Sequence, residues 1–378
     1  MVTGPALLYV CPVIPSTTGN GLAMRAGMVL EALADRYRIS LLAIPSYGAV
    51  DQNIPHRFQQ LCERVVTIPY DSDTQKRIQE AAQPYDASSF DVVHAFRLAS
   101  VPFARNYFRK SGSPLRRHLD LDDIESKTHR RIATLCRDTG NTTLAEKEEA
   151  QGKRIEMLEF AAFRTFDRVY VCSEPDRREL AERCRAEVLV LKNSIRLAEP
   201  LPRAGQSDPF RFLFLGTLGY YPNVDAVRYF CEQVAPLIRK TSTRSFAIDI
   251  VGGGNSEALQ NLAGEMVHLV GAVPDVRPYY EHCQAVIVPI RAAGGTRIKI
   301  LEAFGYGRPV ISTAIGVEGL DAVHGKHLLI ADTPEDFAAA CVRVMSDAAL
   351  TESLIENAGA LVQSSYTIDC LRKVVAAL

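Results

Sequence analysis

Short, continuous apolar runs rich in β-branched residues alternate with helical segments along the whole chain. Because consecutive side chains of a strand point to opposite faces, such runs indicate strands that are covered on both sides, as in parallel sheets flanked by helices. Sheets of this α/β kind bind ligands at the carboxyl ends of their strands. The expected strands are Leu7–Val13, Ile39–Ile44, Val65–Pro69, Val92–Phe96, Val169–Cys172, Val188–Leu191, Phe210–Leu215, Phe246–Val251, Val267–Val270, Val286–Ile290, Val310–Thr313 and Leu328–Ile330.

One segment, from Arg196 to Pro209, interrupts this alternation with prolines, a glycine and small polar residues. A chain of 378 residues is also too long for one ordinary hydrophobic core. The sequence therefore predicts two α/β domains, with the first ending near residue 196 and the second beginning near residue 210. Residues 139–166 are expected to form one long helix.

The overall composition excludes several classes of protein. Charged residues make up 23% of the chain and the formal net charge is -1, which argues against disorder and against a globally basic nucleic-acid binder. No apolar run is long enough to span a membrane, and no basic region precedes the first apolar stretch as in a secretory signal. The nine cysteines form no CxxC pair and fit a reducing cytoplasm.

The strongest ligand-binding pattern lies between Pro289 and Val310. Glycines after a buried strand allow a tight turn, Thr296 can cap the helix that follows, and the free N–H groups of that helix end suit a phosphate. Lys299 lies in the first turn, where a cation opposes the helix dipole unless an anion is nearby. Lys299 and Glu302 share a helix face, so one can reach phosphate and the other ribose hydroxyls. The alternative is an ordinary surface Lys–Glu pair.

This segment resembles the donor-site helix of the GT-B glycosyltransferases, and in particular the large retaining group called family 4. The resemblance is carried by Gly-Thr-Arg-x-Lys-x-x-Glu-Ala, then Gly-x-Pro-Val, then Ser312-Thr313 and the run from Gly316 to Leu320. It implies that Lys299 contacts the donor diphosphate, that Glu302 contacts the ribose, and that the backbone at 294–296 lies near the sugar or phosphates. The donor-binding residues expected in this segment are Gly294, Gly295, Thr296, Arg297, Lys299 and Glu302.

The same resemblance implies the GT-B fold, in which two Rossmann-like domains with parallel sheets face each other across a cleft. Residues 1–196 would bind the acceptor and residues 210–364 the nucleotide sugar, with a last helix at about 365–378 packing back on the first domain. In one respect the chain departs from the family pattern. Many members have a glutamate eight residues before Glu302, where this chain has Gly294. That difference leaves open how the donor sugar is handled.

Further candidates follow other strands of the second half. Gly216, Gly219 and Asn223 resemble the family's glycine turn before a Pro-Asn pair, whose backbone approaches the phosphates. The turns at Gly252 and Val273 would frame the nucleotide base. Relatives often have an Arg and a Lys at the first turn, and this chain has neither, so Lys299, Arg297 and the helix dipole must balance most of the donor charge. The alternative to a donor-binding role for Arg297 is a solvated position on the protein surface.

In the first half, Gly19 and Gly21 lie in a glycine-rich loop between the first strand and a helix from about residue 22, and that loop can approach phosphate or acceptor. His94 is expected at the end of a strand, where the family places a histidine facing the sugar, although a lone histidine is more often structural. Asp120 and Asp122 belong to an acidic cluster expected to follow a strand. The resemblance implies that one of these two aspartates lies near the reaction centre, and the alternatives for the cluster are a metal site and an acidic helix start.

Together these features predict a glycosyltransferase that uses a UDP-, GDP- or dTDP-linked sugar, with retention implied by the resemblance. No cofactor and no metal are expected. The acceptor would be a glycan, a lipid-linked sugar or a small molecule, in polysaccharide or natural-product biosynthesis. An inverting transferase and a catalytically silent sugar-nucleotide-binding subunit remain alternatives. The basic segment 105–137 suggests either peripheral membrane contact or a solvated face. No nucleic-acid partner is expected.

Overall fold

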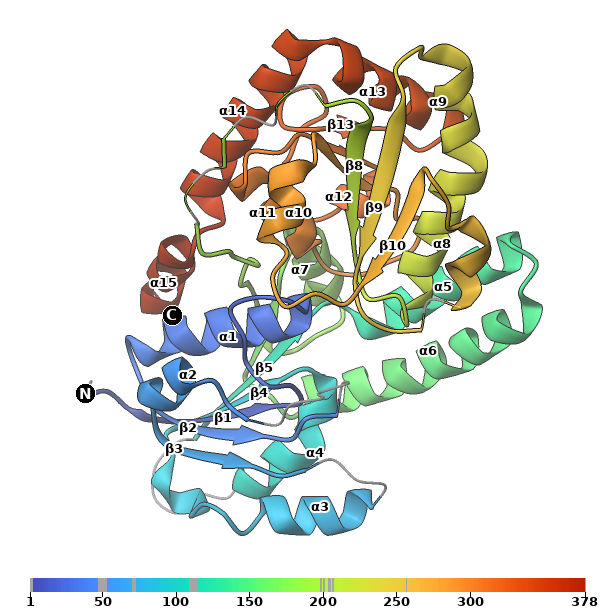
Figure 1. Cartoon of the computed structure of the whole chain (residues 1–378). Helices are drawn as coiled ribbons and strands as arrows, with labels where there is room; N and C mark the ends of the chain where they lie inside the picture. The colour runs from blue at the N-terminus through green and yellow to red at the C-terminus, as the bar shows by residue number, and fades with distance from the viewer. Residues whose placement is uncertain are drawn as a thin grey trace. The chain divides into compact units, whose positions relative to one another are not determined.

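The structure, a computed structural model, describes residues 3–377 except 47–52, 70–72, 109–114, 198, 200, 203–204, 206 and 256. It divides into two compact units, and each is built on its own parallel sheet (Figure 1). The first unit comprises Met1–His129, Glu149–Ser194 and Ile368–Leu378, and the second comprises Arg130–Glu148 and Ile195–Thr367.

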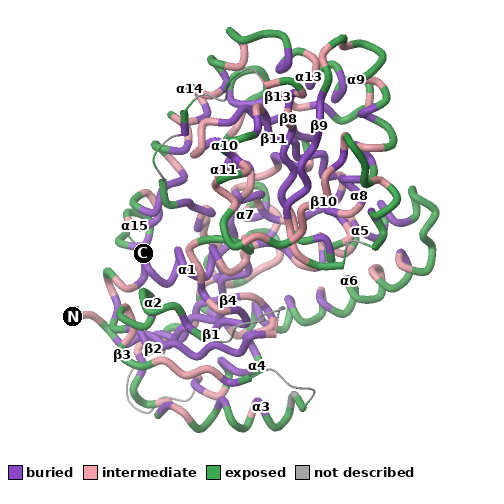
Figure 2. The backbone as a smooth tube through the Cα atoms, in the orientation of Figure 1, coloured by how far each residue is buried: buried purple, intermediate pink, exposed green. Residues whose placement is uncertain are grey.

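The first unit contains a seven-stranded sheet in the order β3-β2-β1-β4-β5-β6-β7, and all its neighbouring strands are parallel. Every residue of β1 and β4 is buried, because helices cover both faces of the sheet (Figure 2). The strands are β1 Ala6–Cys11, β2 Arg38–Ala43, β3 Cys62–Thr67, β4 Val92–Phe96, β5 Arg116–Asp122, β6 Arg168–Val171 and β7 Glu187–Val190.

Two apolar cores fill the two faces of this sheet. Helix α1 is capped by Asn20, whose Oδ1 accepts a hydrogen bond of 2.8 Å from the Leu22 N–H. Helix α15 packs on α1, and its residues Ile368, Leu371 and Val375 complete one core. The helices of this unit are α1 Gly21–Ala34, α2 His56–Leu61, α3 Thr74–Ala81, α4 Val101–Ala104, α7 Glu174–Ala181 and α15 Ile368–Ala377.

The second unit contains a six-stranded parallel sheet in the order β10-β9-β8-β11-β12-β13. Its strands are β8 Phe210–Leu215, β9 Phe246–Val251, β10 Val267–Gly271, β11 Ala285–Val288, β12 Val310–Ser312 and β13 Leu329–Ile330. Its helices are α8 Tyr221–Tyr229, α9 Ala235–Thr241, α10 Arg277–His282, α11 Ile298–Gly305, α12 Ala314–Val317, α13 Pro334–Ser346 and α14 Ala348–Ser365.

A helical hairpin is shared by the two units. It consists of α5 Glu125–Asp138 and α6 Thr142–Phe163, and its tip, Arg130–Glu148, belongs to the second unit. There Ile132, Leu135, Cys136 and Ala145 form a small apolar cluster around Ala292. The sequence predicted that residues 1–196 form one continuous domain. It did not indicate that the tip of this hairpin belongs to the second unit.

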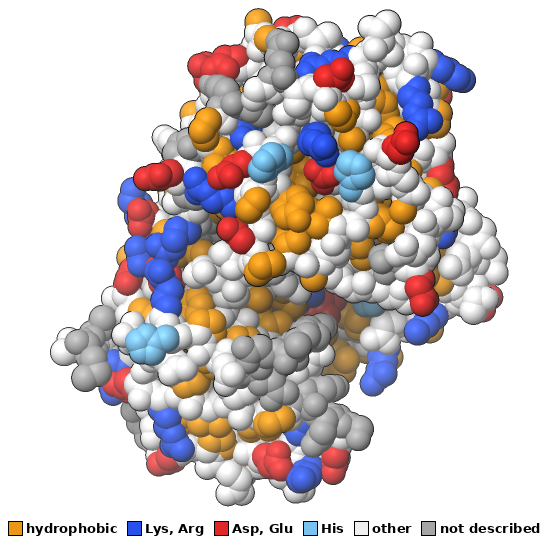
Figure 3. Space-filling view, viewed as in Figure 1, with side chains coloured by type: hydrophobic (Ala, Val, Ile, Leu, Met, Phe, Trp, Pro, Cys, Tyr) orange, Lys and Arg blue, Asp and Glu red, His pale blue; other side chains and the backbone are white. Residues whose placement is uncertain are grey.

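The sequence correctly predicts two Rossmann-like parallel-sheet domains, because both sheets have the strand order typical of that fold. The helix expected over 139–166 runs from Thr142 to Phe163. Among the described residues, no helix is both long and apolar enough to cross a membrane. Basic and acidic side chains are interspersed on the face shown in Figure 3, in keeping with the near-zero net charge. Residues 109–114 of the basic segment, and parts of the expected linker, lie outside the described residues.

Candidate functional site

The expected donor-binding residues of the second half cluster where the strand order of the second sheet reverses. Strands β8 and β11 are neighbours there, although β9 and β10 follow β8 in the chain. In open α/β sheets a crevice forms at such a switch point, beyond the carboxyl ends of the strands. The turn after β8, the turn after β9 and the loop between β11 and α11 all begin at this edge.

Two of the predicted glycines are required by close backbone approach. A Cβ on Gly252 would lie 1.9 Å from the carbonyl oxygen of Gly216, and a Cβ on Gly216 would lie 2.7 Å from Cγ of Asn223. The Leu218 N–H donates a hydrogen bond of 2.7 Å to the carbonyl of Gly253, which joins the two turns. A Cβ on Gly219 would meet nothing within 4 Å, so this position is open to a ligand.

Helix α11 begins one residue later than expected. Its first residue is Ile298, and Arg297 occupies the cap position with an extended backbone and no side-chain cap hydrogen bond. The expectation that Thr296 caps the helix is therefore wrong, because the residue lies one position too early. Lys299 is in the first turn, as the sequence indicated. Gly294 and Gly295 precede the helix, and Gly295 has a φ of 65°, a conformation that favours glycine.

Lys299 is half-buried and held between an amide and an aromatic ring. Its Nζ donates a hydrogen bond of 3.1 Å to Oδ1 of Asn223 and lies 4.7 Å from the ring centroid of Phe214. Asn223 is oriented by a second bond, in which its Nδ2 donates to the carbonyl of Thr217 at 2.9 Å. Burial, helped by the charge of Arg297, lowers the pKa of Lys299 to about 7, against the opposing effect of Glu302.

Arg297 is a buried cation, with 8% of its surface exposed. Its Nη2 donates to the carbonyl of Gly295, whereas its Nε and Nη1 have no hydrogen-bond partner among the described residues. The alternative of a solvated surface position is therefore wrong for this residue. A buried guanidinium with two unsatisfied nitrogens is costly unless an acceptor reaches it. The arrangement indicates that an anion binds beside α11.

Glu302 lies one turn after Lys299 and is also half-buried. Burial raises the pKa of Glu302 to about 7, while the Lys299 ammonium lowers it. Lys299 and Glu302 thus carry opposite charges and both are poorly solvated, which is more typical of a binding site than of an ion pair on the protein surface. Val273 is half-buried in the turn after β10, in the same unit.

Arg131, at the tip of the shared hairpin, binds the loop that precedes α11. It forms a bidentate ion pair with Glu318, with Nη2 to Oε1 at 2.8 Å, and its Nη1 donates to the carbonyl of Ala293 at 2.9 Å. Sequence reasoning missed this role, because the partners are more than 160 positions apart. The only local signal was Glu318 within the quoted glycine motif.

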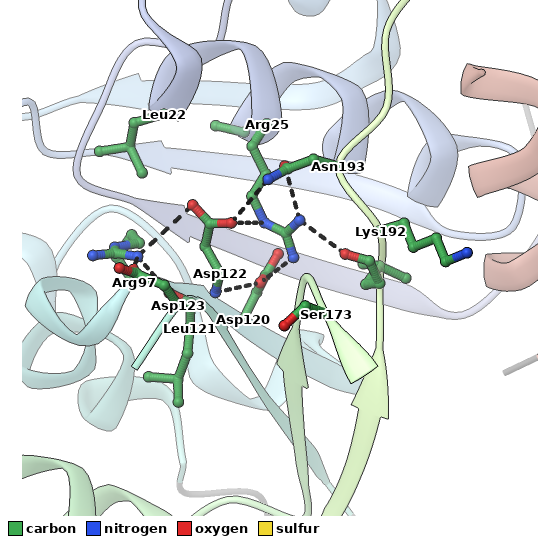
Figure 4. A network of polar contacts seen from close by, with 12 residues as sticks. Leu22, Arg25, Arg97, Asp120, Leu121, Asp122, Asp123, Ser173, Lys192 and Asn193 are labelled. Atoms are coloured by element: carbon green, nitrogen blue, oxygen red, sulfur yellow. Dashed lines mark hydrogen bonds and ion pairs between the residues drawn. The ribbon is translucent and has the colours of Figure 1, made fainter. Parts of the chain in front are cut away.

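In the first unit, Asp120 lies at the centre of the polar network in Figure 4. The residue is completely buried, and its Oδ1 accepts a hydrogen bond of 2.7 Å from Nη2 of Arg25. Arg25 also donates to the carbonyl of Leu191 at 2.8 Å and to Oδ1 of Asn193 at 3.0 Å. Asp120 thus neutralises a buried cation, and removing it would leave that charge uncompensated. Arg25 and Asn193 are contributors that sequence reasoning missed.

Asp122 differs from Asp120 in exposure and in backbone conformation. It is the last residue of β5, its side chain is 18% exposed, and Nδ2 of Asn193 donates to its Oδ1 at 3.2 Å. Asp122 and Arg97 are the only non-glycine residues of the described chain with a positive φ, 64° in both. Strained residues of this kind concentrate at functional sites. Burial raises the pKa of Asp122, and the charges of Arg25 and Arg97 oppose that rise.

The expectation that the acidic cluster follows a strand is wrong, because Asp120 and Asp122 are themselves part of β5. This strand begins with Arg116 and Arg117 and alternates polar and apolar residues only from His118 to Asp122, unlike the continuous apolar strands around it. A buried aspartate is tolerated there because Arg25 reaches it from α1. No group of three His, Cys, Asp or Glu side chains within the described residues is placed to hold a metal ion.

His94 lies in the middle of β4, two residues before its end, so the expected position at the strand end is wrong. Its ring is 1% exposed and stacks between Tyr9 and Tyr170, with centroid distances of 5.2 and 5.7 Å. Neither ring nitrogen has a hydrogen-bond partner in the part of the chain that the structure describes. Burial, followed by the charge of Arg25, lowers the pKa of His94 to about 3. The imidazole is therefore neutral at physiological pH.

The two glycines predicted near the N-terminus lie between β1 and the start of α1. Gly19 is exposed with a φ of 87°, and Gly21 is the first residue of α1. The structure thus brings Gly216, Gly252, Asn223, Arg297 and Lys299 together in the second unit. Gly19, Gly21, His94, Asp120 and Asp122 belong to the first unit.

Comparison with known proteins agrees with this division. Residues 209–347 match the family "Glycosyl transferases group 1". A stretch of 163 residues is 26% identical to an uncharacterized 44.6 kDa protein in the cps region of Klebsiella pneumoniae, and it spans 41% of this chain and 42% of that protein.

Two solved structures are similar over nearly the whole chain. Sucrose-phosphate synthase from Thermosynechococcus elongatus has a TM-score of 0.73 at 17% identity, with 98% of each chain covered. Anabaena HepE, solved with UDP and glucose and also with UDP-glucose, has a TM-score of 0.68 at 14% identity, with 99% of this chain and 98% of HepE covered in the first of these structures. The chain therefore has the fold of GT-B glycosyltransferases, and its residues 209–347 are similar to the glycosyl transferases group 1 domain.

Proposed function

We propose that the protein transfers a sugar from a nucleoside-diphosphate sugar to an acceptor. The observation that carries this proposal is the pair of cations beside α11. Arg297 has two unsatisfied buried nitrogens, and Lys299 has a pKa lowered to about 7. A diphosphate would supply oxygens that accept from the two unsatisfied Arg297 nitrogens and a negative charge that stabilises the Lys299 ammonium.

The group 1 domain supports the activity, and the HepE structures with UDP and with UDP-glucose support the donor class. In our proposal Lys299 and Arg297 hold the diphosphate, Glu302 accepts hydrogen bonds from the ribose, and the turns at Gly216, Gly219 and Val273 approach the nucleotide. UDP is the first nucleotide to test, and GDP and dTDP are its competitors.

The chemistry would be substitution at the anomeric carbon with retention. The bond between that carbon and the diphosphate oxygen breaks, a bond to the acceptor oxygen forms, and the acceptor proton passes to the leaving phosphate. The protein contributes positioning and stabilisation of the leaving group. Among the residues of the first unit, we propose Asp122 as the one that lies near the reacting atoms, because its side chain is partly exposed and its backbone is strained. No bound metal is required in this scheme.

The relative in the cps region supports a role in polysaccharide assembly. None of the nine cysteines, all of which lie in the described part of the chain, forms a disulfide, which supports a location in the reducing cytoplasm. We propose both as working assignments. The acceptor would be a glycan or a lipid-linked sugar, and a small-molecule acceptor is its competitor.

The test measures thermal stabilisation by UDP, GDP, dTDP, ADP and NAD, because a ligand that binds only the native state raises the midpoint of unfolding. It is repeated on Lys299→Ala and Glu302→Ala. Lys240→Ala and Glu356→Ala are matched controls, since both residues are exposed on other helices of the same unit. We expect one nucleoside diphosphate to stabilise the wild type and the controls and to lose its effect in both site variants.

Turnover is then measured with the sugar form of the nucleotide that binds, and the anomeric configuration of the product is determined. Retention of configuration supports the proposed chemistry, and inversion rejects it. Binding without transfer or donor hydrolysis would favour a sugar-nucleotide-binding subunit, for which the glycine at position 294 is the relevant feature. Stabilisation by NAD alone, or by none of the five, would refute the donor assignment.

A further inference from the structure

The second half of α6 exposes a cluster of large apolar side chains. Met157 is 67% exposed, Leu158 51% and Phe160 41%. Met157 and Phe160 are three residues apart and are neighbours on the helix surface, and Leu158 flanks Met157 on the exposed side of α6. The other large exposed apolar residues in the described part of the chain are single and scattered along the sequence. A grouped patch calls for a partner, whereas isolated exposed residues do not.

The exposed charged side chains in this part of α6 all have one sign. Between residues 150 and 164 the exposed charged side chains are Lys153, Arg154 and Arg164, and none of the exposed ones is acidic. Lys153 is paired with Glu149 at 2.9 Å. Arg154 and Arg164 form no ion pair with any described residue, and each lies one turn from the apolar side chains.

Both glutamates of this stretch accept hydrogen bonds from side chains outside α6. Glu156 is half-buried and accepts a hydrogen bond of 2.6 Å from Arg183. Glu159 is buried and accepts from the Ser126 hydroxyl at 2.6 Å and from its N–H at 3.0 Å. The outer face of α6 therefore combines apolar and basic side chains with no exposed carboxylate between residues 150 and 164.

Phe160 is also held in place rather than left to move. The Arg183 guanidinium lies 4.9 Å from its ring centroid, and Phe163 packs edge-on at 6.4 Å. A fixed aromatic ring beside a second cation suits the boundary between lipid headgroups and acyl chains. Apolar anchors flanked by Lys and Arg are the features that bind a helix to the surface of an anionic bilayer.

We propose that α6 docks the protein on an anionic lipid membrane through a membrane patch made of Arg154, Met157, Leu158, Phe160 and Arg164. The apolar side chains enter the interface, and the two arginines contact lipid phosphates. This proposal does not depend on the transferase activity, because none of the five residues belongs to the site beside α11. It differs from the sequence-based suggestion for residues 105–137, which rested on charge alone.

The experiment is sedimentation of the full chain with phosphatidylcholine vesicles and with vesicles that are about one-third phosphatidylglycerol. We expect binding to the anionic vesicles only, weakening as salt rises. Arg154→Ala with Arg164→Ala should reduce the partition coefficient about thirtyfold, from about fivefold for each cation at the surface. Met157→Ser with Leu158→Ser should reduce it at least about tenfold.

Two controls make the result specific to the patch. Val323→Ser removes another exposed apolar side chain, and Lys240→Ala removes another exposed cation, both in the second unit. Neither should change binding, and the midpoint of thermal unfolding should stay at the wild-type value in all four variants. Absence of binding to anionic vesicles, or equal losses in patch and control variants, would overturn the proposal. So would a dimer, detected by analytical ultracentrifugation, that dissociates in the Met157 and Leu158 variant.

Discussion

His94 gives a prediction whose magnitude follows from its surroundings. The pKa of the buried imidazole is about 3, compared with 6.5 for a solvated histidine. Between these two values the unfolded chain binds a proton that the folded chain does not. The stability contributed by neutral His94 is therefore fully present above about pH 7 and is lost as the pH falls toward 3. At pH 5 the penalty amounts to about 2 kcal/mol relative to pH 7.5.

Replacement of His94 by phenylalanine removes the titrating group and keeps a flat ring between Tyr9 and Tyr170. We expect His94→Phe to lose about 2 kcal/mol less stability than the wild type between pH 7.5 and pH 5. The assay is urea unfolding followed by far-UV circular dichroism at both pH values. Hydrogen exchange of the β4 amides assigns the transition to the first unit.

His282→Gln is the control, because it replaces an exposed histidine at the end of α10 in the second unit. Equal losses in the wild type and in His94→Phe would refute the reasoning from burial. Transfer activity in the same variant separates the two roles considered for this residue. A structural His94 leaves the turnover number close to that of the wild type, whereas a catalytic His94 does not.

Three further predictions concern the two units. Bound diphosphate should raise the pKa of Lys299 from about 7, because it stabilises the ammonium. Nucleotide affinity, measured by calorimetry, should therefore fall by up to about fiftyfold as the pH rises from 7 to 9. Lys299→Arg should remove most of this pH dependence. Gly252→Ala should destabilise the second unit by at least about 2 kcal/mol in urea unfolding, whereas Gly264→Ala, whose Cβ would meet nothing within 4 Å, should stay within about 0.5 kcal/mol of the wild type. Asp120→Asn should lower the free energy of unfolding by about 3–5 kcal/mol, because it leaves the buried Arg25 cation without its counter-charge. Asp122→Asn should lower the transfer rate with a much smaller loss of stability, because asparagine also suits a positive φ. The reverse ranking of the two losses of stability would contradict the roles assigned to these residues.

The alternation of strands and helices could be predicted from the sequence because twelve of the thirteen strands overlap apolar runs that can be recognised without knowing their tertiary contacts. Strand β5 was different. Its charges are acceptable only because Arg25, about ninety residues earlier, reaches Asp120, and no local pattern shows that contact. A hint was present, since Arg25 is the single cation of a helix whose only other charged residue is Glu31.

The donor residues of the second unit were predictable to the extent that their chemistry is local. The spacing from Gly294 to Glu302 determines the turn, the helix start and the shared face. Two other features depend on tertiary contacts, which the sequence does not reveal. They are the packing of Gly252 against Gly216 and the hydrogen bond from Arg131 to the carbonyl of Ala293. The helix start itself differed by one residue, which is within the usual uncertainty of such boundaries.

Neither unit is a continuous piece of chain, and this affects the order in which the protein can form during synthesis. The first unit needs Ile368, Leu371 and Val375 to close one of its two cores, and these residues are synthesised only after the whole second unit. The hairpin tip, made much earlier, must wait for Ala292 before its apolar side chains are covered. Unlike a protein whose N-terminal domain folds first and alone, this chain can complete its first unit only after its second unit has been synthesised.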